Sequence, residues 1–187
     1  MIEAWLVSIG IVALAEIGDK TQLLTLVLAA RYRRPWPIVA GIFVATLLNH
    51  GIAGAVGAWL TKAVGPDAMR WILGVSFIAM AGWMLVPDKL DEDDAAPRQV
   101  GGVFASTAVL FFLVEIGDKT QVATVALAAR FDSLLAVVMG TTIGMLLANA
   151  PVAFFGEALA KRLPVRTVHV VAAVVFAALG IGVLLLG

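Results

Sequence analysis

A charged heptad occurs twice in this chain, each time inside a long apolar segment. Its sequence is Glu-Ile-Gly-Asp-Lys-Thr-Gln, and it occupies residues 16–22 and, 99 positions later, residues 115–121. An Asp or Lys at the centre of a bilayer costs at least about 2.5–3.5 kcal/mol on insertion scales. Six ionisable groups repeated in one register therefore require a functional explanation, and we interpret the two heptads as one composite ion site.

The composition indicates an integral membrane protein. Hydrophobic residues make up 61% of the 187 residues, charged residues make up only 14%, and the mean hydropathy is +1.01. A soluble domain of this length does not need so much apolar surface. The net charge of zero argues against a nucleic-acid partner. Because the chain has no cysteine, any metal site must use oxygen or imidazole ligands.

Six segments are long enough to cross a hydrocarbon core about 30 Å thick: residues 3–30, 37–61, 68–87, 101–129, 133–160 and 166–186. Residues 88–100 form a strongly polar stretch with acidic residues at every position from 91 to 94. We therefore expect an all-α integral membrane protein with six transmembrane helices: three at 1–87, an acidic cytoplasmic linker at 88–100, and three at 101–187. Because three is an odd number, the second half must enter from the opposite side, which makes the halves inverted repeats, as in many transporters.

The distribution of Lys and Arg predicts the orientation. Cytoplasmic loops carry an excess of these residues. If the loop after the first segment is cytoplasmic, eight Lys and Arg residues lie inside and three outside, leaving the two heptad lysines aside: Arg31, Arg33, Arg34, Lys89, Arg98, Lys161, Arg162 and Arg166 against Lys62, Arg70 and Arg130. Both termini are then expected outside.

The polar face of the heptads suits a divalent cation that is exchanged for protons. On a helix, the Glu, Asp and Lys of each copy share one face, and Glu16 and Lys20 form an i, i+4 pair. Together, four carboxylates and two ammoniums carry a net charge of −2, which one divalent cation or two protons would neutralise. Crowded carboxylates in a low-dielectric site are expected to hold protons when no metal is bound. This is a physical basis for metal–proton exchange.

The candidate cation ligands are the four carboxylates: Glu16, Asp19, Glu115 and Asp118. Oxygen ligands without sulfur favour calcium, magnesium or manganese. The other polar heptad residues could add neutral oxygens, balance charge or orient the carboxylates: Lys20, Thr21, Gln22, Lys119, Thr120 and Gln121. The glycine in each heptad leaves open whether the helix loosens there, so that backbone carbonyls also face the cation.

Further polar positions at the middle of the membrane correspond across the repeat. In the 99-residue register His50 matches Asn149, and Asn49 precedes His50. A histidine here can be a cation ligand, a proton acceptor or a partner in a hydrogen bond between helices, and the sequence is compatible with each role. We include Asn49, His50 and Asn149 among the supporting residues of the site.

With its two heptads, the chain resembles the calcium/manganese:proton antiporter family, whose members carry an E-x-G-D-K-[TS] motif in each of two three-helix halves. The resemblance covers nearly the whole chain, and residues 16–21 and 115–120 match the motif without departure. It implies that the four carboxylates bind the cation and that Mn²⁺ is exported in exchange for protons. Ca²⁺ is an alternative cargo, which the ligand set barely separates from Mn²⁺. The chain lacks the extra N-terminal segment of the eukaryotic members, so we expect a bacterial inner-membrane protein.

Three other functions stay open at this point. An exporter of amino acids or other small organic solutes would need a larger pocket, but not four clustered carboxylates. An intramembrane enzyme would need a nucleophile, and because the chain offers no serine–histidine or cysteine set, we do not expect an enzyme. A structural protein would use the heptads only to pair helices. As partners we expect the cation, protons and the bilayer, with no prosthetic group, in a monomer or a homodimer.

Overall fold

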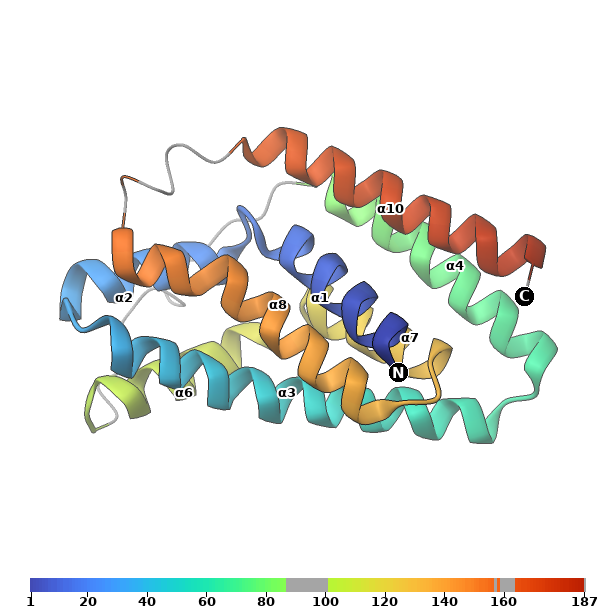
Figure 1. Ribbon diagram of the computed structural model, residues 1–187, viewed down its shortest axis with the longest axis horizontal. Helices are drawn as coiled ribbons and strands as arrows, with labels where there is room; N and C mark the ends of the chain where they lie inside the picture. Colours follow the sequence, from blue (N-terminus) through green and yellow to red (C-terminus); the bar gives the residue numbers. More distant parts are fainter. Residues whose placement is uncertain (87–100, 157, 159–163, 187) are drawn as a thin grey trace.

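The protein is built from α-helices. The computed structural model describes residues 1–86, 101–156, 158 and 164–186, so the predicted linker at 88–100 lies outside the described residues. Within these ranges the chain forms eight helices (Figure 1): α1 (Ile2–Glu16), α2 (Lys20–Tyr32), α3 (Pro35–Ala63), α4 (Pro66–Met84), α6 (Val103–Glu115), α7 (Lys119–Arg130), α8 (Leu134–Phe155) and α10 (Val165–Leu186). The predicted all-α fold is confirmed.

The helix order of the first half recurs in the second. The starts of α2 and α7, of α3 and α8, and of α4 and α10 are each 99 residues apart, as are the ends of α1 and α6. Local sequence explains several of these starts. An aspartate is the N-cap of both α2 and α7, and proline occupies the first turn of α3 and of α4, positions that favour these residues. The two heptads therefore occupy equivalent places in two equivalent series of helices.

The helix is broken inside both heptads. We predicted continuous segments at residues 3–30 and 101–129, but residues 17–19 separate α1 from α2 and residues 116–118 separate α6 from α7. The third residue of each heptad is a glycine with φ of 85° or 78°, a conformation that glycine adopts without steric cost. The sequence left open whether the helix loosens at these glycines, because each break is a single short turn inside an otherwise apolar stretch, which hydropathy does not register.

Long apolar helices and an apolar exterior place the protein in a membrane. Among the described residues, α3, α8 and α10 are long and apolar enough to cross one. They overlap the predicted segments 37–61, 133–160 and 166–186, although α8 ends at Phe155, and the 19-residue α4 takes the place of segment 68–87. Large hydrophobic side chains are exposed on several helices, for example Leu48, Ile52, Trp59, Trp71, Leu147 and Val174. Extensive exposed apolar surface of this kind fits contact with lipid.

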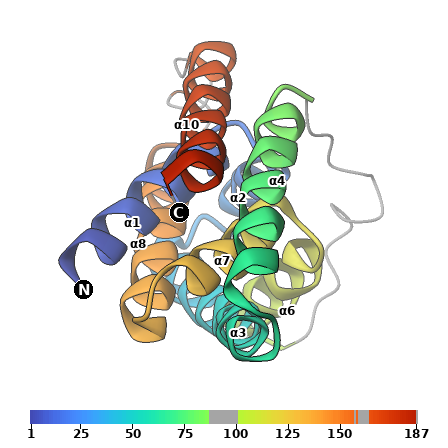
Figure 2. The same cartoon turned by 90° about the vertical axis from the view of Figure 1, so that its right-hand side faces the viewer.

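Helices of one half pack mainly on helices of the other. α1 lies against α8, α6 lies against α3, and α4 lies against α10 (Figures 1 and 2). A Cβ added at Gly140 or Gly144 of α8 would lie 2.7 Å from a backbone oxygen of α1. At the equivalent Gly41 of α3, a Cβ would lie 2.9 Å from the Phe104 carbonyl oxygen of α6. Glycine therefore allows these helices to approach closely.

The hydrophobic core also lies between the halves. One buried cluster draws mainly on α1, α4, α7 and α10, where the rings of Phe77 and Phe176 lie 6.3 Å apart. The second draws on α1, α2, α3, α6 and α8 and includes Leu24, Ile42 and Phe111. The ends of α1 and α6 and the starts of α2 and α7, where the heptads lie, are thus held by packing between the halves.

Candidate cation site

Each heptad turn brings the glutamate that ends one helix close to the aspartate that starts the next. In the first heptad, the Asp19 N–H donates to the Glu16 carbonyl oxygen at 3.1 Å. The Asp19 carboxylate caps α2 by accepting from the Thr21 N–H at 3.4 Å. The Gly18 N–H donates to Gln22 Oε1 at 3.0 Å. The second heptad closes with the equivalent aspartate and glycine N–H bonds, so the sequence itself specifies the turn.

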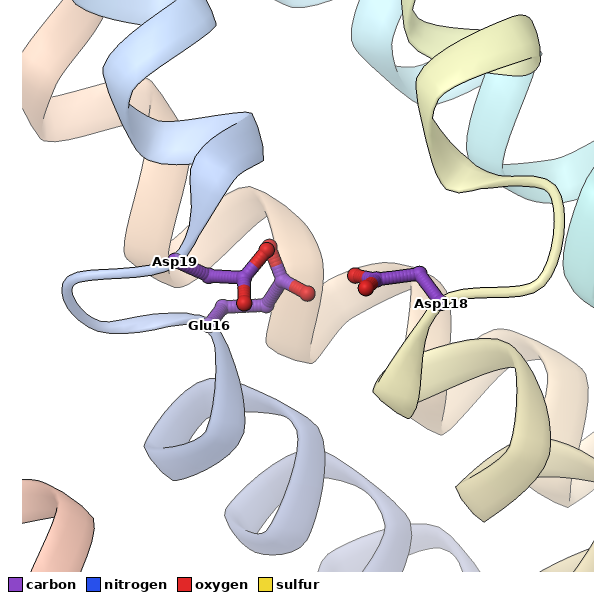
Figure 3. A group of neighbouring side chains, drawn as sticks. All are labelled: Glu16, Asp19 and Asp118. Carbon is purple, nitrogen blue, oxygen red and sulfur yellow. The ribbon is translucent and has the colours of Figure 1, made fainter. Parts of the chain in front are cut away.

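Three carboxylates, contributed by both halves, lie together at these turns. One oxygen each of Glu16, Asp19 and Asp118 lie within 4.8 Å of one another (Figure 3). The three residues are 0%, 1% and 2% exposed, so bulk water does not screen their charges. Glu115 is equally buried at 1% exposure but lies outside this group. Carboxylates held this closely in a dry site require a cation or protons to offset their repulsion.

Each heptad lysine pairs with the aspartate of the other heptad. Lys20 Nζ lies 3.3 Å from Asp118 Oδ1, and Lys119 Nζ lies 3.9 Å from Asp19 Oδ1. The predicted pairing of Lys20 with Glu16 along one helix is wrong, because the turn between them redirects the chain. The crossed pairs instead link the two turns across the interface between the halves.

The heptad threonines bind one oxygen of each glutamate and leave another available. Thr21 Oγ1 donates to Glu16 Oε2, and Thr120 Oγ1 donates to Glu115 Oε1. The opposite oxygens, Glu16 Oε1 and Glu115 Oε2, have no hydrogen-bond partner among the described residues, and neither does Asp118 Oδ2. Carboxylate oxygens with available lone pairs in a buried site can accept a cation.

The heptad glutamines attach each turn to a long helix of the opposite half. Gln22 Nε2 donates to the Ala148 carbonyl oxygen of α8 at 3.0 Å, and Gln121 Nε2 donates to the Asn49 side chain of α3. Asn49 in turn donates to the Phe112 carbonyl oxygen of α6 at 3.3 Å. These bonds fix the position of both turns relative to α3 and α8.

The two glutamates have different neighbours on α3 and α8. Asn149 Nδ2 of α8 donates to Glu16 Oε2 at 3.3 Å, and Asn149 Oδ1 accepts from Thr25 Oγ1 at 2.8 Å. His50 of α3, the counterpart of Asn149, places Nε2 3.5 Å from Glu115 Oε1. Both side chains are fully buried. The structure thus brings the supporting residues expected on α3 and α8 next to the heptads.

Sequence reasoning missed several residues of this network, among them Thr25, Thr124 and Val86. Thr25 bonds to Asn149, and its counterpart Thr124 donates to a carbonyl one turn earlier at 2.7 Å. Their shared 99-residue register was a signal that could have identified them. The Val86 carbonyl oxygen accepts from Lys119 Nζ at 3.3 Å. No sequence signal marks Val86, because every residue carries a carbonyl.

Buried carboxylates shared between the halves of a multi-pass membrane protein place the chain in the class of ion transporters. Residues 4–92 and 103–187 match the model of the family described as divalent cation/proton antiporter GDT1. The chain belongs to this GDT1 family. The match falls in two segments that follow the two halves, which supports the repeat.

Relatives of this chain occur in bacteria and plants. It is 50% identical over 171 residues to a Vibrio cholerae protein named "Putative manganese exporter", with 91% of this chain and 84% of the relative aligned. It is 26% identical over 195 residues to a GDT1-like protein of Synechocystis, covering 94% of each chain. A GDT1-like protein of Oryza sativa is 22% identical over 201 residues, with 94% of this chain and 71% of the relative aligned. No solved structure matches the chain.

The family assignment decides among the functions left open by the sequence. It confirms the resemblance drawn from the doubled motif and the prediction of a divalent cation/proton antiporter. The protein is a transporter and not an enzyme. Export of organic solutes and a purely structural role are therefore set aside.

Proposed function

We propose that this antiporter exports Mn²⁺ in exchange for protons and binds the cation at Glu16, Asp19, Glu115 and Asp118. The observation that carries this proposal is the buried group of three carboxylates, drawn from both heptads, with oxygens within 4.8 Å of one another. Oxygen ligands of this kind suit manganese, magnesium and calcium. The name of the Vibrio cholerae relative supports Mn²⁺ among these cations.

Charge balance supports the exchange of one divalent cation for two protons. Four heptad carboxylates accompany two heptad lysines, which leaves two negative charges for the cargo to offset. When the cation leaves, two protons restore the same balance. An empty, fully ionised site is the costly state inside a bilayer, so the site returns only when it is loaded with protons.

The fold accommodates six membrane crossings. In this proposal α1 with α2, and α6 with α7, each make one broken crossing, and α3, α4, α8 and α10 make one each. The equal spacing of helix ends in the two halves supports this arrangement. Three crossings in each half invert residues 101–187 relative to residues 1–87. The Lys and Arg distribution puts both termini outside and the linker at 88–100 in the cytoplasm. The protein then spans the inner membrane of a bacterial cell.

The broken crossings offer a route to alternating access. In an inverted arrangement, α1 and α7 lie toward one side of the membrane and α2 and α6 toward the other. α10 packs on α1, and α4 packs on α7. The α4–α10 pair therefore lies on the side of the membrane that α1 and α7 occupy. Rocking of this pair toward α2 and α6 would close the other side, as inverted-repeat transporters do.

Transport by the purified protein in sealed liposomes tests the proposal. With a pH gradient imposed, Mn²⁺ and Ca²⁺ movement is followed together with internal pH. We expect metal flux to require the gradient and protons to move in the opposite direction. Asp118→Asn should lower the Mn²⁺ flux at least about 100-fold, because it removes both a ligand and a charge.

The matched control is Glu3→Gln, which removes an exposed carboxylate at the start of α1. We expect this variant to transport like the wild type. Metal movement without proton counterflow would contradict antiport. Full flux in Asp118→Asn would remove the carboxylate group from the mechanism.

A further inference from the structure

The two halves place different residues beside their glutamates. The heptads are identical, and Thr25 and Thr124 correspond beyond them. The side chain on the neighbouring long helix, however, is Asn149 next to Glu16 and His50 next to Glu115. A repeated fold does not require this difference, so the imidazole adds a property that the amide lacks.

Asn149 is fully engaged in fixed hydrogen bonds. Its Nδ2 donates to Glu16 Oε2 at 3.3 Å and to the Met145 carbonyl oxygen at 3.2 Å. Its Oδ1 accepts from Thr25 Oγ1 at 2.8 Å. With both ends of the amide bonded, Asn149 orients Glu16 and has no need of a further partner.

His50, in contrast, has spare bonding capacity in a dry environment. It is 0% exposed, and its Nε2 lies 3.5 Å from Glu115 Oε1, longer than the about 2.7–3.2 Å of a well-formed N–H···O bond. Among the described residues, His50 Nδ1 and Glu115 Oε2 have no hydrogen-bond partner. A neutral imidazole carries one acceptor nitrogen, and in the tautomer with its proton on Nδ1 the lone pair is on Nε2, the nitrogen that faces Glu115 Oε1.

We propose that His50 and Glu115 bind the transported cation as a nitrogen–oxygen pair, and that this nitrogen makes the site prefer Mn²⁺ to Ca²⁺. The inference rests on the proposed function and adds a selectivity determinant to it. Metal–ligand bonds of about 2.0–2.6 Å place two ligands of one ion about 3–5 Å apart, and the 3.5 Å separation fits. Ca²⁺ takes oxygen ligands, whereas imidazole is a common ligand of transition metals.

The nitrogen–oxygen pair adjoins the group of three carboxylates through Asp118. Asp118 interacts electrostatically with His50 and with Glu115, and it also belongs to the group with Glu16 and Asp19. The site then has an all-oxygen part in the first heptad and a nitrogen-containing part in the second. Asp118 belongs to the first part by distance and interacts electrostatically with both residues of the second.

Pulsed electron paramagnetic resonance of Mn²⁺ bound to the full chain in detergent tests the ligand directly. A bound imidazole gives nitrogen hyperfine coupling, which we expect in the wild type and not in His50→Asn. The chain has one other histidine, His169, whose Nε2 lies 2.8 Å from the Ile17 carbonyl oxygen. His169→Gln is the matched control and should keep the coupling. Bound Mn²⁺ without nitrogen coupling in the wild type would overturn the inference, whether or not a variant folds.

Transport selectivity gives the second readout. In liposomes, we expect His50→Asn and His50→Gln to lower the ratio of the Mn²⁺ exchange rate to the Ca²⁺ exchange rate at least about tenfold. An unchanged preference in both variants would overturn the inference and leave the antiporter intact. A wild-type protein that exchanges neither metal for protons would instead contradict the proposed function.

Discussion

The two heptads share one sequence but occupy different surroundings. The Lys20 side chain is 22% exposed, whereas that of Lys119 is 1% exposed. Glu16 belongs to the group of three carboxylates and Glu115 does not. An amide orients Glu16, whereas an imidazole faces Glu115. A repeated motif therefore specifies the local turn, and the helices of the opposite half specify what the turn contacts.

The largest difference between the halves is expected in the rate of Mn²⁺/proton exchange when either heptad glutamate is replaced by glutamine. We expect Glu16→Gln to lower Mn²⁺/proton exchange at least about 100-fold, because it removes a member of the three-carboxylate group. Glu115→Gln should lower exchange only about tenfold, because that group remains complete. Initial rates in liposomes over a range of Mn²⁺ concentrations measure both variants. Equal losses would show that the two halves contribute equally to the site.

The lysines should differ in their contribution to stability. Lys119→Met should lower the free energy of unfolding by about 3 kcal/mol, because it removes a buried ammonium that faces Asp19 and the Val86 carbonyl. Lys20→Met should lower it by only about 1 kcal/mol, since this side chain is partly exposed. Thermal unfolding of both variants in the same detergent compares them. A larger drop in melting temperature for Lys20→Met would reverse the comparison.

The smallest difference is expected at the heptad glycines. Both have positive φ, so alanine costs about 1–2 kcal/mol at either position. A Cβ at Gly18 would also lie 2.2 Å from Val165 Cγ1, whereas at Gly117 no described atom lies within 4 Å. We therefore expect Gly18→Ala to cost about 1 kcal/mol more than Gly117→Ala.

A second substitution separates strain from crowding in that comparison. Val165→Ala should recover the extra loss in the Gly18→Ala background, because it removes the methyl groups that a Cβ would meet. It should not rescue Gly117→Ala. Melting temperatures of the single and double variants provide the measurement, and a double variant no more stable than Gly18→Ala would exclude crowding by Val165.

The sequence predicted those helices whose signal, a long apolar run, lies within a single segment. The long apolar runs indicated α3, α8 and α10, and the 99-residue register indicated equivalent halves. The turns at residues 17–19 and 116–118 were left open. A single glycine inside an apolar stretch is compatible with either a helix or a break, and the choice depends on packing against the opposite half.

The structure brings the proposed site residues together, but their pairing differs from the one that the sequence predicted. The four carboxylates are all buried at the heptad turns. Lys20, however, was assigned to Glu16 and instead pairs with Asp118. Spacing along one segment reports neighbours on a single helix. It contains no information on which groups the opposite half presents, so crossed pairs could not be derived from it.

Because the halves pack on each other, neither half of the chain would complete the core or the cation site alone. Both hydrophobic clusters and the group of three carboxylates draw on helices from both halves. In the terms of quaternary structure, residues 1–86 and 101–187 behave as two subunits of a heterodimer. The intervening segment raises the effective concentration of one subunit around the other. Produced as separate chains, each would expose its interface until it met its partner in the bilayer, and cation binding would depend on their concentrations.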